Sequence, residues 1–196
     1  MRQLLLSPSL FLLPAVATAE VFDFNIGSDS FRLNLNGKLQ RLFSVDSGQY
    51  DGGIIAKRGD DNQTDIYQGH FGVLITGDAG ASNADVHAGL GVRLMVADVD
   101  PSTGGAVALG GEFEARLPQF NRVGVFGYAY GAPRATSLGD MNRYTEIAVA
   151  IDYQVIREAS IYLGYRNIKY GLDKDPLGDD TRTRDTGIHG GLRLNF

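Results

Sequence analysis

The sequence predicts an all-β fold, an antiparallel up-and-down transmembrane β-barrel of eight to ten strands, and three observations lead to it. Apolar and polar residues alternate in runs that recur along the chain, as on strands with two different faces. The chain ends on such a run, HGGLRLNF, and not on the polar tail with which most domains finish. Glycine is abundant, with 26 residues against 6 prolines, and many glycines lie inside the alternating runs, as expected of a strongly curved sheet.

Residues 1–19 have the layout of a secretory signal peptide, with Arg2 followed by an apolar stretch and small residues before the expected cut. The stretch contains two prolines and is shorter than the ~20 residues of a membrane-spanning helix, so a membrane anchor is the weaker interpretation. We expect residues 20–196 to form one barrel domain, because 43% of the chain is hydrophobic and 21% is charged. No later segment has the length and hydropathy of a transmembrane helix, so an exported membrane protein of this sequence must cross as a barrel.

The N-terminal part of this domain predicts a hairpin, because VFDFNI and FRLNLNG lie within 21–47. The strands predicted further along the chain are 50–58, 65–75, 85–96, 106–117, 122–130, 144–155, 160–170 and the terminal run to Phe196. Bacterial single-chain barrels have an even number of strands. These eight strands and the hairpin therefore favour ten strands over eight.

The alternation is clearest at 144–155, where apolar residues such as Ile147 alternate with polar ones such as Glu146. In RVGVFGYAY, at 122–130, large apolar residues occur at both odd and even positions, so the sequence does not decide which face of this strand points into the barrel.

The predicted connections differ in length. Residues 119–121 and 157–158 are tight, whereas 98–104, 132–142 and 172–184 are longer and polar. Short turns at one rim and longer loops at the other are typical of outer-membrane barrels.

Alternation alone does not decide which face points into the barrel, and a soluble lipocalin-type barrel with an apolar cavity has a similar pattern. The polar positions of the alternating runs carry nearly equal numbers of positive and negative residues, which can pair across strands inside a narrow barrel. The candidate lumen-lining residues are Arg93, Glu112, Glu114, Arg116, Glu146, Asp152, Arg166, Asp185, His189 and Arg193. The terminal aromatic residue favours the membrane arrangement, because a soluble barrel has no reason to end on Phe196.

The terminal run HGGLRLNF resembles the signal by which the assembly machinery of Gram-negative bacteria recognises outer-membrane proteins. The positions that match are His189, Gly191, Leu192, Leu194 and Phe196. VFGYAYGAP at 125–133, followed by YTEIAVAIDYQVIREASIYLGYRNIKYGLDKD, resembles the YfaZ family of small outer-membrane proteins. The resemblance implies the outer membrane of a Gram-negative bacterium but no activity.

Composition excludes several kinds of chemistry. With no cysteine, the chain has no disulfides, thiolate zinc sites or cysteine nucleophile. A net charge of −5 argues against a nucleic-acid partner. None of His70, His87 and His189 has a serine two residues away, so we expect histidines in a polar network rather than in a hydrolase triad. Glu112 and Glu114 share a face with Arg116, which favours an ion pair over acid/base catalysis.

The sequence therefore predicts a small integral outer-membrane barrel of non-enzymatic type, either a structural or interaction component or a narrow channel. No catalytic, cofactor-binding or metal-ligating residue is assigned, and no cofactor is expected. The expected partners are outer-membrane lipids, lipopolysaccharide and, during biogenesis, the barrel-assembly machinery, and the chain is expected to be a monomer. Two alternatives stay open, namely an outer-membrane lipid-modifying hydrolase and a soluble periplasmic lipid carrier.

Overall fold

The computed structural model describes residues 20–41, 48–59, 65–79, 84–116, 118–173 and 183–196. The predicted signal peptide, 1–19, lies outside the described residues.

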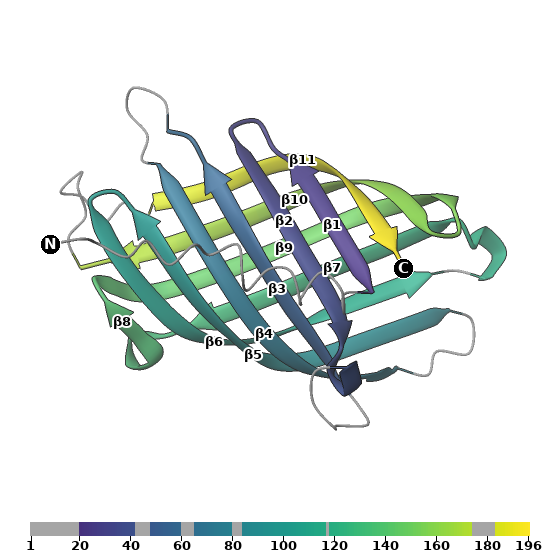
Figure 1. Ribbon diagram of the computed structural model, residues 1–196, viewed down its shortest axis with the longest axis horizontal. Coiled ribbons are helices and arrows are strands. Elements are labelled where there is room, and N and C mark those ends of the chain that lie inside the picture. The colour runs from purple at the N-terminus through teal and green to yellow at the C-terminus, as the bar shows by residue number, and fades with distance from the viewer. Residues whose placement is uncertain (1–19, 42–47, 60–64, 80–83, 117, 174–182) are drawn as a thin grey trace, which may run out of the picture.

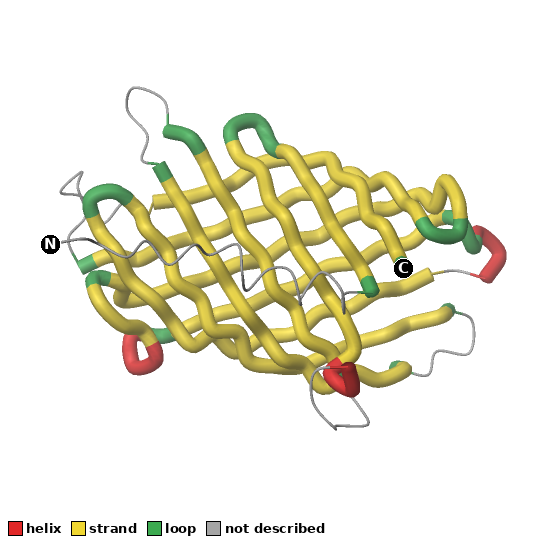
Figure 2. Tube along the Cα trace, viewed as in Figure 1, coloured by secondary structure: helices red, strands yellow, loops and turns green. Residues whose placement is uncertain are grey.

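Strands make almost the whole of the described structure, and short 3-10 helices occur only in connections (Figure 2). The strands are β1 (Val21–Ile26), β2 (Ser30–Lys38), β3 (Gln49–Lys57), β4 (Ile66–Asp78), β5 (Asp85–Val99), β6 (Ser102–Arg116), β7 (Val123–Ala132), β8 (Ser137–Gly139), β9 (Met141–Ile156), β10 (Ala159–Leu172) and β11 (Thr183–Asn195). The 3-10 helices are η1 (Leu39–Arg41), η2 (Pro118–Phe120) and η3 (Arg134–Thr136). None of the helices in the described part of the chain is long and apolar enough to cross a membrane.

The sheet closes on itself as a ten-stranded antiparallel barrel (Figure 1). β1 pairs with β11, in yellow, from Val21 opposite Asn195 to Ile26 opposite Gly190, and β5 pairs with β6. β8 is a short addition beside β6 and is not one of the ten strands of the wall. The prediction of an antiparallel barrel, and the preference for ten strands, are confirmed.

The N-terminal hairpin explains why the chain can end on a strand. β11 is hydrogen-bonded to β10 on one side, and its last residues, Gly190 to Asn195, are paired with β1 on the other, so the end of the strand has no free edge. The backbone N–H of Phe196 continues this ladder and donates to the carbonyl of Glu20 at 2.8 Å.

We call the end of the barrel at Val21 and Asn195 the terminal rim, and the opposite end the far rim. The predicted loop at 98–104 is wrong, because β5 and β6 are joined at the far rim by Asp100 and Pro101 alone. Val99 and Ser102 pair with each other and are buried, so both strands continue to the turn. The terminal rim also carries a long connection, 39–48. The predicted division into a short-turn rim and a long-loop rim therefore holds only in part.

The outer face of the wall is apolar, whereas the inner face carries buried polar and charged residues together with a cluster of buried hydrophobic ones. On β9, Glu146 and Asp152 are buried, whereas Ile147 and Ile151 point outward and are exposed. The structure also decides β7, whose two faces both look apolar in the sequence. Tyr130 is buried in the lumen and Val125 is exposed on the outer surface. The sequence pattern was ambiguous here because this strand presents aromatic residues to the lumen.

Candidate functional site: a charged lumen closed toward the far rim

Packed side chains, most of them apolar, fill the lumen from its middle toward the far rim, and we call them the plug. Its members are buried and come from seven strands of the wall: Ile55, Ile66, Leu74, Met95, Ala97, Val99, Ala106, Ala108, Tyr130, Ala132, Met141, Tyr144, Ile168 and Tyr170. The hydroxyl of Tyr170 donates to Gln68 Oε1 at 2.5 Å, and Gln68 Nε2 donates to the Tyr144 hydroxyl at 3.1 Å. Because β4 and β10 are on opposite sides of the closed sheet, these bonds cross the lumen.

A network of charges centred on Glu146 lies against the plug. Glu146 is fully buried, and its two oxygens accept hydrogen bonds from Arg32 Nη1 at 2.7 Å and from Arg93 Nη1 at 2.9 Å. The Tyr144 hydroxyl also donates to Glu146. Arg93 Nη2 donates a hydrogen bond to Asp51 Oδ2 at 2.6 Å. Burial of so many charges is tolerated because each is paired and hydrogen-bonded.

Aromatic rings hold the two arginines of this network in place. The guanidinium of Arg93 lies over the ring of Tyr130 at 3.6 Å, and that of Arg32 lies 5.0 Å from the ring centre of Tyr128. Arg32 also donates a hydrogen bond to the Tyr128 hydroxyl. A cation over an aromatic face is attracted by the ring quadrupole, so the plug and the charges stabilise each other.

A second network ties β1, β2, β10 and β11 together near the far rim. Arg166 donates to Asp185 Oδ2 at 3.0 Å, to Asn25 Oδ1 at 2.9 Å and to Ser30 Oγ at 3.0 Å.

In the turn after β1, burial of Asp29 acts to raise its pKa, but the hydrogen bond and the charge of Lys57 outweigh it and lower the pKa. Lys57 Nζ lies 3.1 Å from Asp29 Oδ2.

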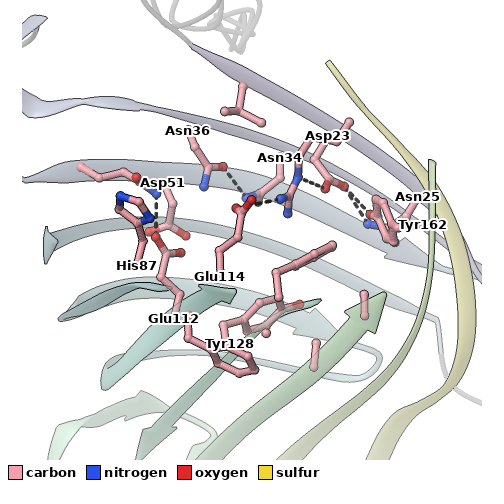
Figure 3. Close-up of a pocket in the computed structure, with 18 of the residues that line it drawn as sticks. Asp23, Asn25, Asn34, Asn36, Asp51, His87, Glu112, Glu114, Tyr128 and Tyr162 are labelled. Carbon is pink, nitrogen blue, oxygen red and sulfur yellow. Dashed lines mark hydrogen bonds and ion pairs between the residues drawn. The ribbon is translucent and has the colours of Figure 1, made fainter. Parts of the chain in front are cut away.

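On the terminal side the lumen opens into a cavity of about 410 Å³, which we call the vestibule (Figure 3). Most of the residues that line it are polar or charged, and they include Asp23, Asn25, Arg32, Asn34, Asn36, Gln49, Asp51, Asp85, His87, Arg93, Glu112, Glu114, His189 and Arg193. Phe126, Tyr128 and Tyr162 add aromatic surface. The Tyr162 hydroxyl donates to Asp23 Oδ1 at 2.5 Å.

The charges of the vestibule are paired unequally. Arg193 lies between Glu114 Oε2 at 3.3 Å and Asp23 Oδ2 at 3.5 Å, with its guanidinium 3.8 Å from the ring centre of Phe126. Outside the vestibule wall, Arg116 Nη2 donates to Asp152 Oδ2 at 2.8 Å. Glu112 differs, because its hydrogen bond comes from the neutral Gln49 Nε2 at 2.7 Å. No ion pair formed among the described residues includes Glu112.

The structure brings the sequence-predicted lumen residues into two groups. The first group is buried and comprises Arg93, Glu146, Asp152, Arg166, Asp185 and His189. Within this group, Asp152 is beside Arg116 of the second group, to which it is hydrogen-bonded. The second group is nearer the terminal rim, is partly exposed and comprises Glu112, Glu114, Arg116 and Arg193. His87, expected in a lumen network, instead has a side chain 61% exposed at the terminal rim, with Nδ1 3.2 Å from Asp85 Oδ1. His70 is buried with Nε2 3.2 Å from Asp51 Oδ2.

The predicted assembly-signal residues lie along β11 and just after it. Leu192 and Phe196 point outward and are exposed, Phe196 at 79%. Gly191 faces inward, where an added Cβ would lie 2.3 Å from the Tyr162 ring, so any larger residue would displace Tyr162. Glycine is therefore required at this position by packing within the barrel.

Arg32, Asp51 and Tyr144 are central residues that were not singled out from the sequence. Arg32 does lie on the polar parity of FRLNLNG, together with Asn34, so the signal for its inward position was present. Asp51 lies in a strand whose alternation is interrupted by Gly52 and Gly53, which hides its face.

Comparison with known families places the chain. The sequence pattern of the family described as "YfaZ precursor" matches residues 1–196, the whole chain. The chain belongs to the YfaZ family. The resemblance noted at 125–133 is thereby confirmed, and this YfaZ-family chain has the barrel described above.

Comparison with individual proteins adds little for this YfaZ-family chain. No curated protein matches it. One similar solved structure comes from work entitled "Unveiling the Mechanism Behind the in-meso Crystallization of Membrane Proteins". It is 10% identical to this chain, the match covers 90% of this chain and 82% of that one, and the TM-score is 0.36. Within the described residues, no group of three or more histidine or acidic side chains is placed to hold a metal ion.

Proposed function

We propose that the protein is a small integral outer-membrane barrel of non-enzymatic type, a structural or interaction component whose lumen is closed to solute flow. One observation carries the proposal: large apolar side chains are exposed around the outside of the barrel, whereas its inside holds buried charges and the largely apolar plug. Such a distribution is the reverse of that in a water-soluble protein and matches the lipid-facing and lumen-facing alternation of membrane barrels.

The apolar outer surface supports insertion into a bilayer. Large apolar side chains are exposed on the outer face of every strand from β3 to β11 except β8, whose exposed Leu138 lies at the far rim. Leu90 on β5 is 76% exposed and Ile188 on β11 is 68% exposed. Contiguous apolar surface on this scale is not stable in water and marks a surface that contacts lipid or another protein.

The lumen supports a closed barrel over the narrow channel that the sequence left open. A ten-stranded barrel has little room inside, and here the plug and the Glu146 network fill the section beyond the vestibule. A lipid carrier of lipocalin type is also disfavoured, because its cavity would be apolar, whereas the vestibule is lined by charged groups and amides.

A lipid-modifying hydrolase has little support from the histidines. A triad requires a serine within hydrogen-bond reach of the histidine. His70 and His87 instead approach Asp51 and Asp85, and His189 packs edge-on against Tyr162.

Membrane insertion predicts a heat-dependent mobility on SDS gels. We expect the protein to fractionate with outer membranes, to require detergent for extraction, and to migrate differently before and after boiling, because a closed barrel resists SDS until it is heated. The measurement is immunoblotting of cell fractions with and without boiling. A water-soluble protein with unchanged mobility would contradict the proposal.

Closure of the lumen predicts the absence of conductance. In planar bilayers we expect no stable current steps from the wild type or from Glu112→Ser, because residue 112 lines the vestibule and the plug lies beyond it. A general porin in the same bilayer shows that the assay detects channels, and the gel shift shows that the test protein is folded. Steps in the wild type that change in Glu112→Ser would instead support the narrow channel.

A further inference from the structure

The vestibule is the place where the charge balance of the lumen is incomplete. Its wall carries the carboxylates Asp23, Asp51, Asp85, Glu112 and Glu114 against the guanidiniums of Arg32, Arg93 and Arg193. Arg32 and Arg93 both also bind Glu146, which is deeper in the lumen. The wall is therefore rich in negative charge and in hydrogen-bond acceptors.

Glu112 is the clearest sign of an unfilled site. It lies on the inward face of β6 and is held by the amide of Gln49, with no cationic side chain among the described residues within ion-pairing distance. Figure 3 shows the Glu112 carboxylate directed toward Asp51 on the same side of the cavity. Two ionised carboxylates that face one cavity repel each other, and a cation between them would relieve the repulsion.

Two deeply buried polar atoms in the same wall also lack hydrogen-bond partners among the described residues. Asp51 is 1% exposed, and its Oδ1 has no hydrogen-bond partner among the described residues, although Oδ2 is bound by Arg93. His189 is 6% exposed, and its Nδ1 likewise has no partner. Buried polar atoms without partners are rare and require an explanation, such as a ligand that carries donors.

The carboxylates follow the wall from the mouth inward. Asp85 and Glu114 have substantially exposed side chains near the terminal rim, Glu112 is intermediate and Asp51 is buried. Glu112 and Glu114 are two residues apart on one strand, which separates them by about 6.6 Å. Acidic groups spread along a wall suit an elongated ligand with several positive charges better than a single metal ion.

We propose that the vestibule binds a linear aliphatic polyamine, which enters from the terminal rim. Its ammonium groups carry only donors and positive charge, which complements Glu112, Glu114 and the free acceptor of Asp51. Ammonium groups three or four methylenes apart have a spacing close to that of the two glutamates. The cavity volume of about 410 Å³ lies within the ~300–1,000 Å³ of small-ligand sites.

The test uses the full mature chain refolded in detergent micelles and titrated with spermidine in a calorimeter. We expect saturable binding at one site, with affinity reduced at least tenfold in Glu112→Gln, which removes the charge and keeps the shape. The matched control is Asp98→Asn, the same charge change near the far rim of β5, where we expect affinity within twofold of the wild type. Glu114→Gln is a second variant and should weaken binding less, because Arg116 and Arg193 already pair with Glu114.

The competing outcomes are distinct. No binding to the wild type, equal losses in Glu112→Gln and Asp98→Asn, or equally tight binding of Mg²⁺ or of the uncharged 1,8-octanediol would each overturn the proposal. The heat-dependent gel shift is recorded for every variant, so a variant that misfolds is recognised. If Glu112→Gln misfolds, Glu114→Gln takes its place in the comparison with Asp98→Asn. Failure to bind spermidine would leave the membrane assignment and the closed lumen untouched, because neither depends on a ligand.

Discussion

Replacing Glu146 with alanine is expected to lower the free energy of unfolding by about 3–5 kcal/mol, the range typical of breaking a buried charge cluster. Glu146 is fully buried and is the shared partner of Arg32 and Arg93. Without Glu146, the positive charges of both guanidiniums stay buried in the lumen with fewer negative charges to balance them. The Tyr144 hydroxyl also loses its hydrogen-bond acceptor. The measurement is urea unfolding in lipid vesicles, followed by circular dichroism because the chain has no tryptophan.

Two further variants separate charge from packing. Glu146→Gln keeps nearly the same volume and removes the charge, so most of the loss should persist if charge compensation is the cause. Glu114→Ala removes a carboxylate that also touches two arginines, but its side chain is 45% exposed. Partly solvated ion pairs contribute about 0–1 kcal/mol, and we expect a loss in that range. Equal losses for Glu146→Ala and Glu114→Ala would show that the network does not stabilise the barrel.

The strands were predictable because each is a local pattern. The alternation at 144–155 lies within β9, and VFDFNI and FRLNLNG predicted the hairpin that the structure shows as β1 and β2. The tight turn at Asp100 and Pro101 was missed because polar residues around it suggested a loop. In the structure Asp98 and Thr103 are paired strand residues, which a polar sequence alone does not reveal.

The partners inside the lumen were not predictable, because barrel closure decides them. The alternation along β9 was enough to predict that Glu146 points into the barrel. Its contact with Arg32, however, joins two residues that are 114 positions apart in the sequence. The plug was hidden for a related reason. A lumen strand is expected to alternate polar with apolar, and Tyr128 and Tyr130 break that rule because they pack against Arg32 and Arg93.

A charge placed on the outer surface at mid-height should destabilise the protein only if that surface contacts lipid. Val149 is near the middle of β9, is exposed, and pairs with Tyr165 and Gly127 near the middles of β10 and β7. We expect Val149→Arg to lower the free energy of unfolding by about 2–4 kcal/mol in vesicles, the depth-dependent cost of arginine at the midplane of a bilayer. Urea titration of the vesicle-bound protein measures it.

The matched control is Leu138→Arg, which makes the same kind of change at an exposed apolar residue of β8 near the far rim. At the interface the cost of arginine falls to about 0–1 kcal/mol, because its charged end reaches water. A soluble barrel would tolerate both substitutions equally, since both side chains would already be in water. A difference of at least 1 kcal/mol between the two variants therefore reports depth in a bilayer, and equal, small effects would mean that the apolar surface meets something other than lipid.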